Sequence, residues 1–509
     1  MHHAKIHTMQ ELSKIIADEK ARGEKVVHAH GVFDLLHIGH VLHLRTARSY
    51  GNRLVVTLTA DRYVNKGVGR PVFSQQQRAE MLASLEIVDL VAVNDAPDAI
   101  PAIDAIKPNY YVKGPDYKNP EDDITGKITA EINAVRSHGG ELVVTDDETH
   151  SSSALLNRHM GIYDKELQLF LNNFRDNSGP EQIGDLFDKV SRMKVLLVGD
   201  TIIDEYVYCD SIGKSAKESI IATKYMDTEV YAGGVVAAAR HMADFVESVD
   251  VVTMVGDQDD YDELIRSVLP DNVRLHILTR ADAPTTRKSR MVEPAYFRKM
   301  FEIYYFEDSP INGQLSRDLH DLIEGLVGKT DMTVVTDFGH GLISADTIDV
   351  LCEKSKFLAV NAQTNAANRG FNPVTRYRKA DFICIDREEA KIAAQNKHVT
   401  LEYVIRDFLP KGTECHKFII TKGKDGCICF DSHKEGVHTI PALTQRVVDT
   451  IGAGDAFFVV TAPIIAVGGS LEEAGLVGNA AGAMKAQFVG HADSVHRMDL
   501  MKYVTALLK

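Results

Sequence analysis

The sequence lacks an apolar run long enough to cross a membrane, and its first residues lack the apolar core of a secretion signal. It also lacks a long basic run, and its net charge is −15 at pH 7. Nucleic acid and anionic membranes are therefore not expected as partners, because both attract positively charged surfaces. We expect a protein of the cytoplasm.

Cysteine is scarce, and all six cysteines lie at or after position 209 of the 509 residues. In a large chain without an export signal, reduced thiols are the simplest interpretation. No cysteine or histidine pair with metal-ligand spacing accompanies Cys427 and Cys429, so a metal site is not expected there. A hydrophobic content of 44% and a charged content of 25% are ordinary for a globular protein. The length predicts about two to four domains.

Residues 449–457 read D-T-I-G-A-G-D-A-F, and three small residues stand directly before Asp455. Gly452, Ala453 and Gly454 would let backbone N–H groups approach a phosphate, and a helix that begins here would favour anions. Asp455, at the edge of such an anion hole, can take the proton of an incoming hydroxyl. The stretch resembles the signature of the ribokinase-like (PfkB) sugar kinases. A plain Gly/Ala turn is the alternative.

A second motif, residues 30–40, reads H-G-V-F-D-L-L-H-I-G-H between a predicted strand at 25–29 and a predicted helix. His37 and His40, three residues apart, can both face an anion at the helix N-terminus. This arrangement suits attack on the α-phosphate of a nucleoside triphosphate, where positioned donors stabilise the growing charge. Two histidines without a role are the alternative.

The first part of the chain resembles a known family. Residues 26–158 are similar to the cytidylyltransferase-like nucleotidyltransferases, and most similar to the adenylyltransferase half of the bifunctional heptose-7-phosphate kinase and heptose-1-phosphate adenylyltransferase family. The motifs are G-V-F-D-L-L-H-I-G-H at 31–40, G-R-P-V at 69–72, Q-R-A-E-M-L-A at 77–83, V-K-G-P-D-Y at 112–117 and S-S-S-A-L-L at 151–156. The resemblance implies a Rossmann-like, doubly wound α/β sheet with ligands at the carboxyl ends of the strands.

The resemblance also implies roles for single residues. Lys66 is expected to reach triphosphate oxygens. Arg78 is expected to bind phosphate, with a helix-surface salt bridge as the alternative. The other implied nucleotide contacts are Gly31, Phe33, Asp34, Gly39, Lys113, Gly114, Asp116, Ser152 and Ser153. His30 departs from the family, in which Asn is frequent at this position.

The second part of the chain resembles the ribokinase-like α/β fold, and specifically the heptose-7-phosphate kinase half of the same family. From residue 194 onward strands and helices alternate, which predicts a parallel sheet with crossover helices. We expect a nucleotidyltransferase domain at 1–160, a helical linker at 161–192 and a kinase domain at 193–509. The order of the domains is reversed relative to the family, in which the kinase comes first.

A sugar pocket and a nucleotide site are implied in this part. The sugar contacts would be Asp204, Gly233, Gly234, Lys288, Arg290, Asn361, Gln363 and Asn365. The nucleotide contacts would be Asp386, Glu389, Thr421, Lys422, Gly423, Gly452, Ala453 and Gly454. Glu389 is expected to act on Mg²⁺ through water, and Asp449 is expected to help hold a monovalent cation such as K⁺.

Three features of the predicted sugar pocket are unusual. Arg287, Lys288 and Arg290 could clamp a sugar phosphate, or they could form a solvated strand face. The amides of residues 361–372 could meet sugar hydroxyls, or they could serve turns. Ala237 stands where relatives have Asn. Together these features indicate a retuned pocket.

The resemblance implies a bifunctional enzyme that makes a nucleotide-activated sugar. One half would phosphorylate a sugar phosphate, heptose 7-phosphate, with Mg-ATP, and the other would join a sugar 1-phosphate to a nucleotide and release pyrophosphate. The same chemistry on another sugar or alditol phosphate with CTP is one alternative, and a kinase half that only binds or dimerises is another. A homodimer or higher oligomer is expected, because ribokinase-like proteins often dimerise.

Overall fold

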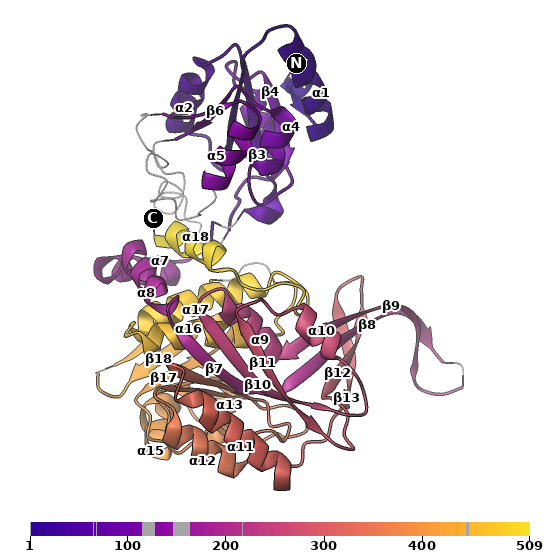
Figure 1. Ribbon diagram of the computed structural model, residues 1–509, viewed down its shortest axis with the longest axis vertical. Coiled ribbons are helices and arrows are strands. Elements are labelled where there is room, and N and C mark those ends of the chain that lie inside the picture. The colour runs from indigo at the N-terminus through magenta and orange to yellow at the C-terminus, as the bar shows by residue number, and fades with distance from the viewer. Residues whose placement is uncertain are drawn as a thin grey trace. The chain divides into compact units, whose positions relative to one another are not determined.

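The computed structural model describes residues 2–64, 66–67, 69–114, 128–145, 163–215, 217–434, 436–443 and 447–508. The chain divides into two compact units (Figure 1). Unit 1 is Met1–Leu171 with Met498–Lys509, and unit 2 is Asn172–Arg497. The predicted domain borders at residues 160 and 193 remain a proposal, and the structure places the last helix, α18 (Arg497–Leu508), mostly in unit 1.

Unit 1 is built on a six-stranded parallel sheet in the order β1-β4-β3-β2-β5-β6. The strands are β1 (Ile6–His7), β2 (Val26–Gly31), β3 (Arg53–Thr59), β4 (Leu90–Asn94), β5 (Tyr110–Lys113) and β6 (Glu141–Val144). The helices are α1 (Met9–Ala21), α2 (Ile38–Arg48), α3 (Gln75–Ala83), α4 (Ile100–Ile106) and α5 (Ile128–Ser137). The strand order reverses between β2 and β5, and ligands of open α/β sheets bind outside the strand ends at such a point.

Alternate residues of β2 explain why both faces of this sheet are covered. Val27 packs in a core cluster with Leu44 of α2 and Leu82 of α3. Val26, which points to the other face, packs in a cluster with Leu12 of α1. A parallel sheet buried on both faces needs such nearly continuous apolar strands. The doubly wound fold predicted for this part is confirmed.

Unit 2 is built on a nine-stranded sheet in the order β11-β10-β7-β14-β15-β16-β17-β18-β19. Pairing is parallel from β11 to β17 and antiparallel for β18 and β19. The strands are β7 (Lys194–Gly199), β10 (Ser248–Gly256), β11 (Val273–Arg280), β14 (Met332–Asp337), β15 (Leu358–Ala362), β16 (Phe382–Asp386), β17 (Lys417–Thr421), β18 (Cys427–Asp431) and β19 (Val437–Ile440). The predicted parallel sheet is confirmed.

A second sheet of four strands, in the order β13-β12-β8-β9, accompanies the first. Its strands are β8 (Thr201–Lys214), β9 (Ile221–Gly234), β12 (Arg287–Glu293) and β13 (Arg298–Tyr305). Within unit 2, the hairpin of β8 and β9 extends away from the main sheet (Figure 1).

Helices complete unit 2, and α16, which begins inside the D-T-I-G-A-G-D-A-F motif, is buried along most of its length. These helices are α7 (Lys165–Asn177, shared with unit 1), α8 (Pro180–Val190), α9 (Val235–Ala243), α10 (Asp262–Ser267), α11 (Gly313–Val327), α12 (Ala345–Lys354), α13 (Arg387–Ala393), α14 (Leu401–Tyr403), α15 (Leu409–Gly412), α16 (Ala453–Ala466) and α17 (Leu471–Lys485). Asp455 to Ile465 of α16 are all buried. A helix that is apolar all round must lie in a core, so α16 holds its N-terminus rigidly.

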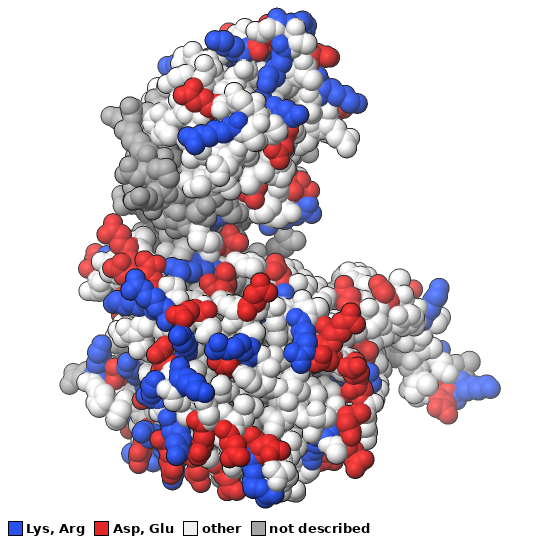
Figure 2. All heavy atoms as spheres, viewed as in Figure 1, with Lys and Arg blue, Asp and Glu red and all other residues white. Residues whose placement is uncertain are grey.

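The surface mixes both signs of charge. On the described residues of the face in Figure 2, Lys and Arg side chains lie among Asp and Glu side chains. No helix of the described part of the chain combines the length and hydropathy that a membrane span needs. The described residues of the face in Figure 2 therefore create an electrostatic potential of mixed sign rather than one extended basic surface.

Candidate active sites

The turn between β2 and α2 carries the paired histidines of unit 1. His37 is the N-cap of α2, and its Nδ1 accepts a hydrogen bond from the Gly39 backbone N–H at 3.1 Å. The ring of His40 stacks on that of His37, with centroids 4.1 Å apart. Gly31 ends β2 directly before this turn. The structure thus brings two imidazoles to a helix N-terminus, where backbone N–H groups favour an anion.

The protonation state of His40 follows from its surroundings. Burial, with smaller electrostatic contributions from His37 and Lys66, lowers the pKa of His40 to about 3. The imidazole is therefore neutral at pH 7. Since Lys66 acts on His40 through its charge, the structure places this predicted triphosphate contact in the same region. The Phe33 and His40 rings pack edge to face with centroids 5.3 Å apart, so Phe33 helps to hold the His40 ring in place.

Asp34 and Arg78 hold the loops of this site rather than facing a ligand. Asp34 accepts a hydrogen bond from the Val72 backbone N–H at 2.7 Å, and it pairs with Arg70 at 3.1 Å. Arg78 is fully buried and donates to the Val32 and Thr59 carbonyls at 2.5 and 2.9 Å. Arg78 also forms a salt bridge with Asp61 at 2.6 Å, although Arg78 itself is buried rather than at the surface. These contacts give Arg78 a positioning role, and its predicted phosphate contact stays a prediction.

The end of β5 carries two more of the predicted contacts. Lys113 is buried and pairs with Glu131 at 2.9 Å, while Glu131 also accepts from the Tyr111 hydroxyl at 3.0 Å. Gly114 follows, and a Cβ added there would meet nothing within 4 Å. The remaining predicted contacts of this site, Asp116, Ser152 and Ser153, lie outside the described residues.

Beneath this site His28 is fully buried, and it gives a testable pH dependence. Its Nε2 lies 2.7 Å from Thr57 Oγ1, and burial lowers its pKa to about 3, helped by the charge of Lys113. The unfolded chain therefore binds the proton more tightly than the folded one. Stability from this group is complete above pH 6.5 and is lost as the pH falls below it.

We expect the free energy of unfolding of unit 1 to fall by on the order of 2 kcal/mol between pH 7.5 and pH 5 through His28 alone. His28→Gln keeps a hydrogen-bonding side chain that does not titrate, so its stability should depend less steeply on pH. Urea denaturation of the whole chain, followed by circular dichroism, measures this. The half-exposed His138→Gln is the matched control. Equal pH slopes for His28→Gln and the unsubstituted protein would contradict the assignment.

In unit 2 the N-terminus of α16 presents the predicted base. Gly452 has φ +77° and is the N-cap, so a glycine is required before Ala453 and Gly454 begin the helix. Asp455 lies in the first turn and is buried. Gln363 Nε2 donates to Asp455 Oδ1 at 2.5 Å and to Asn361 Oδ1 at 2.9 Å. Gln363, predicted to bind sugar, therefore orients the base.

The hydrogen bond from Gln363 favours the charged form of Asp455. Burial raises the pKa of Asp455 overall, and His491 and the Gln363 hydrogen bond oppose that rise. We expect Gln363→Leu to move the acidic limb of the kinase rate to higher pH, because the base must be a carboxylate. The rate should recover at higher pH. Gln314→Leu, on the exposed face of α11, is the control, and an unmoved limb would contradict the role.

The sugar side of this site is an ion-pair cluster around Asp204 on β8. His491 Nε2 lies 3.2 Å from Asp204 Oδ2, and Arg290 of β12 pairs with Asp204 and, at 2.9 Å, with Glu302. Burial alone would raise the pKa of Asp204, but the hydrogen bonds from His491 and Arg290 hold it below its ordinary value. The sequence motifs did not predict His491, because it lies in a loop after α17 and only the fold brings it close to Asp204.

Two glycines at the end of β9 are required by this packing. A Cβ at Gly233 would lie 2.0 Å from Asp204 Oδ2, and one at Gly234 would lie 2.3 Å from the Asp200 carbonyl. Gly234 also has φ +59°. These glycines were predicted to admit the sugar. In the structure Gly233 first admits the carboxylate of Asp204.

Of the three cationic side chains on β12, Arg290 and Arg287 have polar partners among the described residues, and Lys288 differs from them. Arg290 is engaged by acids, and Arg287 donates to the Tyr261 hydroxyl at 3.1 Å. Lys288 lies over the Tyr304 ring at 5.4 Å and donates no hydrogen bond to a described residue. The buried His340 has no partner for either ring nitrogen within the described part of the chain. Lys288 and His340 are thus the polar groups that can meet a substrate.

Amides of residues 361–372 tie this loop to the ends of neighbouring strands. Asn365 and Asn368 donate to the Phe338 carbonyl at 3.0 and 2.8 Å, and Asn372 donates to Asp337 Oδ1 at 3.0 Å. Asn361 donates to the Cys384 carbonyl at 2.7 Å. Asn365 Oδ1 also accepts from the backbone N–H groups of Ala367 and Asn368, which is the turn alternative. The sugar contacts predicted for Asn361 and Asn365 stay predictions.

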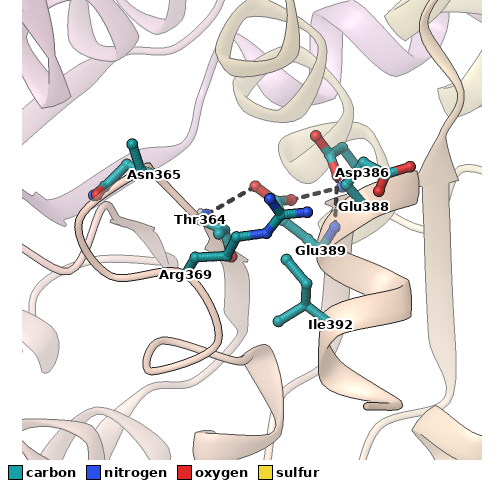
Figure 3. Close-up of a pocket in the computed structure, with 8 residues that line it drawn as sticks. Thr364, Asn365, Arg369, Asp386, Glu388, Glu389 and Ile392 are labelled. Carbon is teal, nitrogen blue, oxygen red and sulfur yellow. Dashed lines mark hydrogen bonds between the residues drawn. The ribbon is translucent and has the colours of Figure 1, made fainter. Parts of the chain in front are cut away.

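A pocket of 280 Å³ lies beside the amide loop (Figure 3), and Glu389 lines it with Asp386 and Arg369. Asp386 and Glu389 form a capping box, in which each accepts from the other's backbone N–H at 2.7 Å. Glu389 also accepts from Thr364 N–H at 3.2 Å. Burial and the neighbouring Asp386 raise the pKa of Glu389 to about 8.

These carboxylates fit a water-mediated contact to Mg²⁺ better than direct ligation. Each Glu389 oxygen already accepts one backbone N–H, and hard cations prefer several oxygen ligands. No three His, Cys, Asp or Glu side chains of the described ranges are grouped to hold a metal ion. Thr421 ends the neighbouring strand β17, and the Lys422 carbonyl, before Gly423, accepts from Arg387 at 2.8 Å.

Two family models match the sequence. Residues 28–159 match the cytidylyltransferase-like model, and residues 192–497 match the pfkB family carbohydrate kinase model. The chain belongs to the pfkB family of carbohydrate kinases. The pfkB match contains both the Asp204 cluster and Asp455, and the cytidylyltransferase-like match contains His37 and His40. The predicted cytidylyltransferase-like part and the predicted pfkB part, in that order along the chain, are confirmed.

Curated relatives match the N-terminal part of the pfkB-family chain. The bifunctional protein HldE of Geobacter metallireducens is 39% identical over 166 residues, which is 32% of each chain. That of Methylobacillus flagellatus is 42% identical over 144 residues, which is 28% of each chain. The chain thus matches about a third of the length of these relatives.

Solved structures are similar to the pfkB part. The ribokinase of Thermotoga maritima is 19% identical, with 61% of this chain and 99% of that chain covered and a TM-score of 0.48. The phosphofructokinase-2 of Escherichia coli in complex with potassium is 15% identical, with 62% and 99% covered and a TM-score of 0.48.

Proposed function

We propose that the chain makes a nucleotide-activated sugar in two steps, at two separate sites. The pfkB part phosphorylates a sugar phosphate with Mg-ATP, and the cytidylyltransferase-like part joins a sugar 1-phosphate to a nucleotide. The observation that carries the proposal is the presence, in one chain, of a buried carboxylate at the N-terminus of α16 and of stacked histidines at the N-terminus of α2. A sugar phosphate made by one site is the substrate class of the other.

In the kinase step, Asp455 takes the proton of the sugar hydroxyl. The hydroxyl oxygen then attacks the γ-phosphorus of ATP, the bond to the bridging oxygen breaks, and ADP leaves. The backbone N–H groups at Gly452 to Gly454 favour the transferring phosphoryl group. Lys288 and His340 bind the polar groups of the sugar phosphate. Glu389 would contact Mg²⁺ through water, and the ion bound with the nucleotide would neutralise the phosphate charge.

In the transfer step, an oxygen of the sugar 1-phosphate attacks the α-phosphorus of the nucleotide, and pyrophosphate leaves. No covalent intermediate with the protein is needed. His37, His40 and the start of α2 stabilise the charge that grows on the α-phosphate. Lys66 neutralises the leaving phosphates.

We propose heptose 7-phosphate as the sugar and ADP-heptose as the type of product. The resemblance of the motifs in both parts supports this choice, and a separate phosphatase would have to remove the 7-phosphate between the two steps. A nucleotide screen tests the base: pyrophosphate release with ATP supports an ADP-sugar, whereas release with CTP alone favours another sugar or alditol phosphate. Sugar-dependent ADP release tests the kinase step, and its absence would favour a kinase half that only binds.

We further propose a homodimer or higher oligomer in the cytoplasm. The hairpin of β8 and β9 exposes large apolar side chains, namely Ile212, Ile220, Ile221, Tyr225 and Met226. Exposed apolar patches of this kind mark interaction sites. All six cysteines are free and buried, which supports a reducing compartment. Light scattering of the purified chain distinguishes monomer from oligomer.

A further inference from the structure

Asp449, the first residue of the motif at 449–457, was predicted to hold a monovalent cation. In the structure both oxygens of its carboxylate accept hydrogen bonds from protein groups. It is buried at 2% exposure. Oδ1 accepts from Lys299 Nζ at 2.6 Å and from the Ile451 N–H at 3.2 Å. Oδ2 accepts from the Tyr206 hydroxyl at 2.7 Å and from the Gly490 N–H at 2.9 Å. A carboxylate offers about four lone pairs, so none is left for a metal ion.

Lys299 is held firmly at this position. It lies on β13, and its Nζ lies 5.9 Å from the centres of both the Tyr206 and the Phe297 rings. Ring faces attract cations, so the two rings hold the ammonium in place in addition to its ion pair with Asp449. A lysine ammonium is a compact single positive charge, as a potassium ion is.

A second ammonium makes a further cation still less favourable. Lys485, at the end of α17, is fully buried, and among the described residues its Nζ has no hydrogen-bond partner. Its Cε would lie 3.2 Å from a Cβ at Gly452. The charges of both Asp449 and Lys299 act on Lys485, so the three groups share one region. A potassium ion there would meet repulsion from two lysines.

We propose that the Lys299 ammonium takes the place of the predicted monovalent cation at Asp449, so that the kinase site is positioned without potassium. This inference rests on the proposed kinase function, and it replaces the K⁺ expectation. Asp449 binds the N–H of Ile451 and so shapes the turn that leads to Gly452 and the start of α16. Lys299 is a positioning residue, because it acts on this turn and not on the substrate.

The first test compares thermal melting of the full chain in potassium chloride and in tetramethylammonium chloride at equal ionic strength. The unsubstituted protein should melt at the same temperature in both salts. Lys299→Met leaves the carboxylate a place for an ion, so potassium should raise its melting temperature specifically, by about 2–4 °C. Arg298→Met, an exposed neighbour on β13, should behave as the unsubstituted protein does. This readout needs no substrate.

The second test measures sugar-dependent ADP release in the same two salts. The unsubstituted rate should agree within about twofold, while Lys299→Met should lose about tenfold in tetramethylammonium and regain it in potassium. Lys299→Arg keeps the charge and should be indifferent to the salt, even if Lys299→Met does not fold. Saturable potassium activation of the unsubstituted protein, or a folded, fully active and salt-indifferent Lys299→Met, would overturn the inference. No ADP release with any sugar would sink the proposed function, and the melting result would still decide the inference.

Discussion

Asp455→Asn is expected to lower the rate of sugar phosphorylation by about 10²–10⁴-fold, the range that a positioned general base supplies. The amide cannot take the hydroxyl proton, but it has the shape of the carboxyl and stays within reach of Gln363. Nucleotide affinity should therefore change little. Nucleotidyl transfer, which takes place in the other unit, should be unchanged.

The matched control is Asp321→Asn, an exposed carboxyl on α11 of the same unit. It should leave both rates unaltered. The rates are measured as ADP release and pyrophosphate release in separate assays. If Asp455→Asn also abolished pyrophosphate release, the two sites would not be independent, and if it left ADP release intact, Asp455 would not be the base.

His40→Ala is expected to lower nucleotidyl transfer by about 10²–10³-fold, as the loss of one positioned donor does elsewhere. His40 is neutral at pH 7 because burial lowers its pKa, so it acts as a hydrogen-bond donor and not as a charge. Its rate contribution should stay constant from pH 6 to pH 8, far above the pKa of about 3. Kinase activity should be unaltered.

The control for this variant is His138→Ala, whose ring in unit 1 pairs only with the exposed Asp104 among the described contacts of that ring. Pyrophosphate release is followed with a saturating sugar 1-phosphate, so that a change in kcat is separated from a change in KM. An equal loss in His138→Ala would indicate general destabilisation, and an unaltered rate in His40→Ala would remove the histidine pair from the reaction.

Local patterns predicted the elements that carry the site. The predicted strand at 25–29 lies in β2, and the predicted helix after it is α2, which begins at the His37 cap. These features depend on neighbours in the chain, as the hydrogen bond from the Gly39 N–H to His37 does. The small residues before Asp455 likewise predicted the N-terminus of α16, because that geometry is local.

Contacts between distant segments could not be predicted in the same way. Lys299 meets Asp449 across 150 residues, and His491 meets Asp204 through a loop without a motif. Arg78 was expected to bind phosphate, with a helix-surface salt bridge as the alternative, and its burial and its bonds to backbone carbonyls could not be read from its neighbours in the sequence. The amides near Asn365 fit a sugar pocket or a turn equally well as sequence, and their bonds to the Phe338 carbonyl, 27 residues away, could not be predicted from it.

The central claim is that one chain converts a sugar phosphate into a nucleotide-activated sugar. Phosphorus NMR of the purified chain with heptose 7-phosphate, Mg-ATP and pyrophosphatase tests its first step most directly. We predict a new anomeric phosphate signal that is absent in Asp455→Asn and kept in His40→Ala. No new signal from a folded protein that binds ATP would contradict the heptose assignment, and an equal signal from Asp455→Asn would contradict the site.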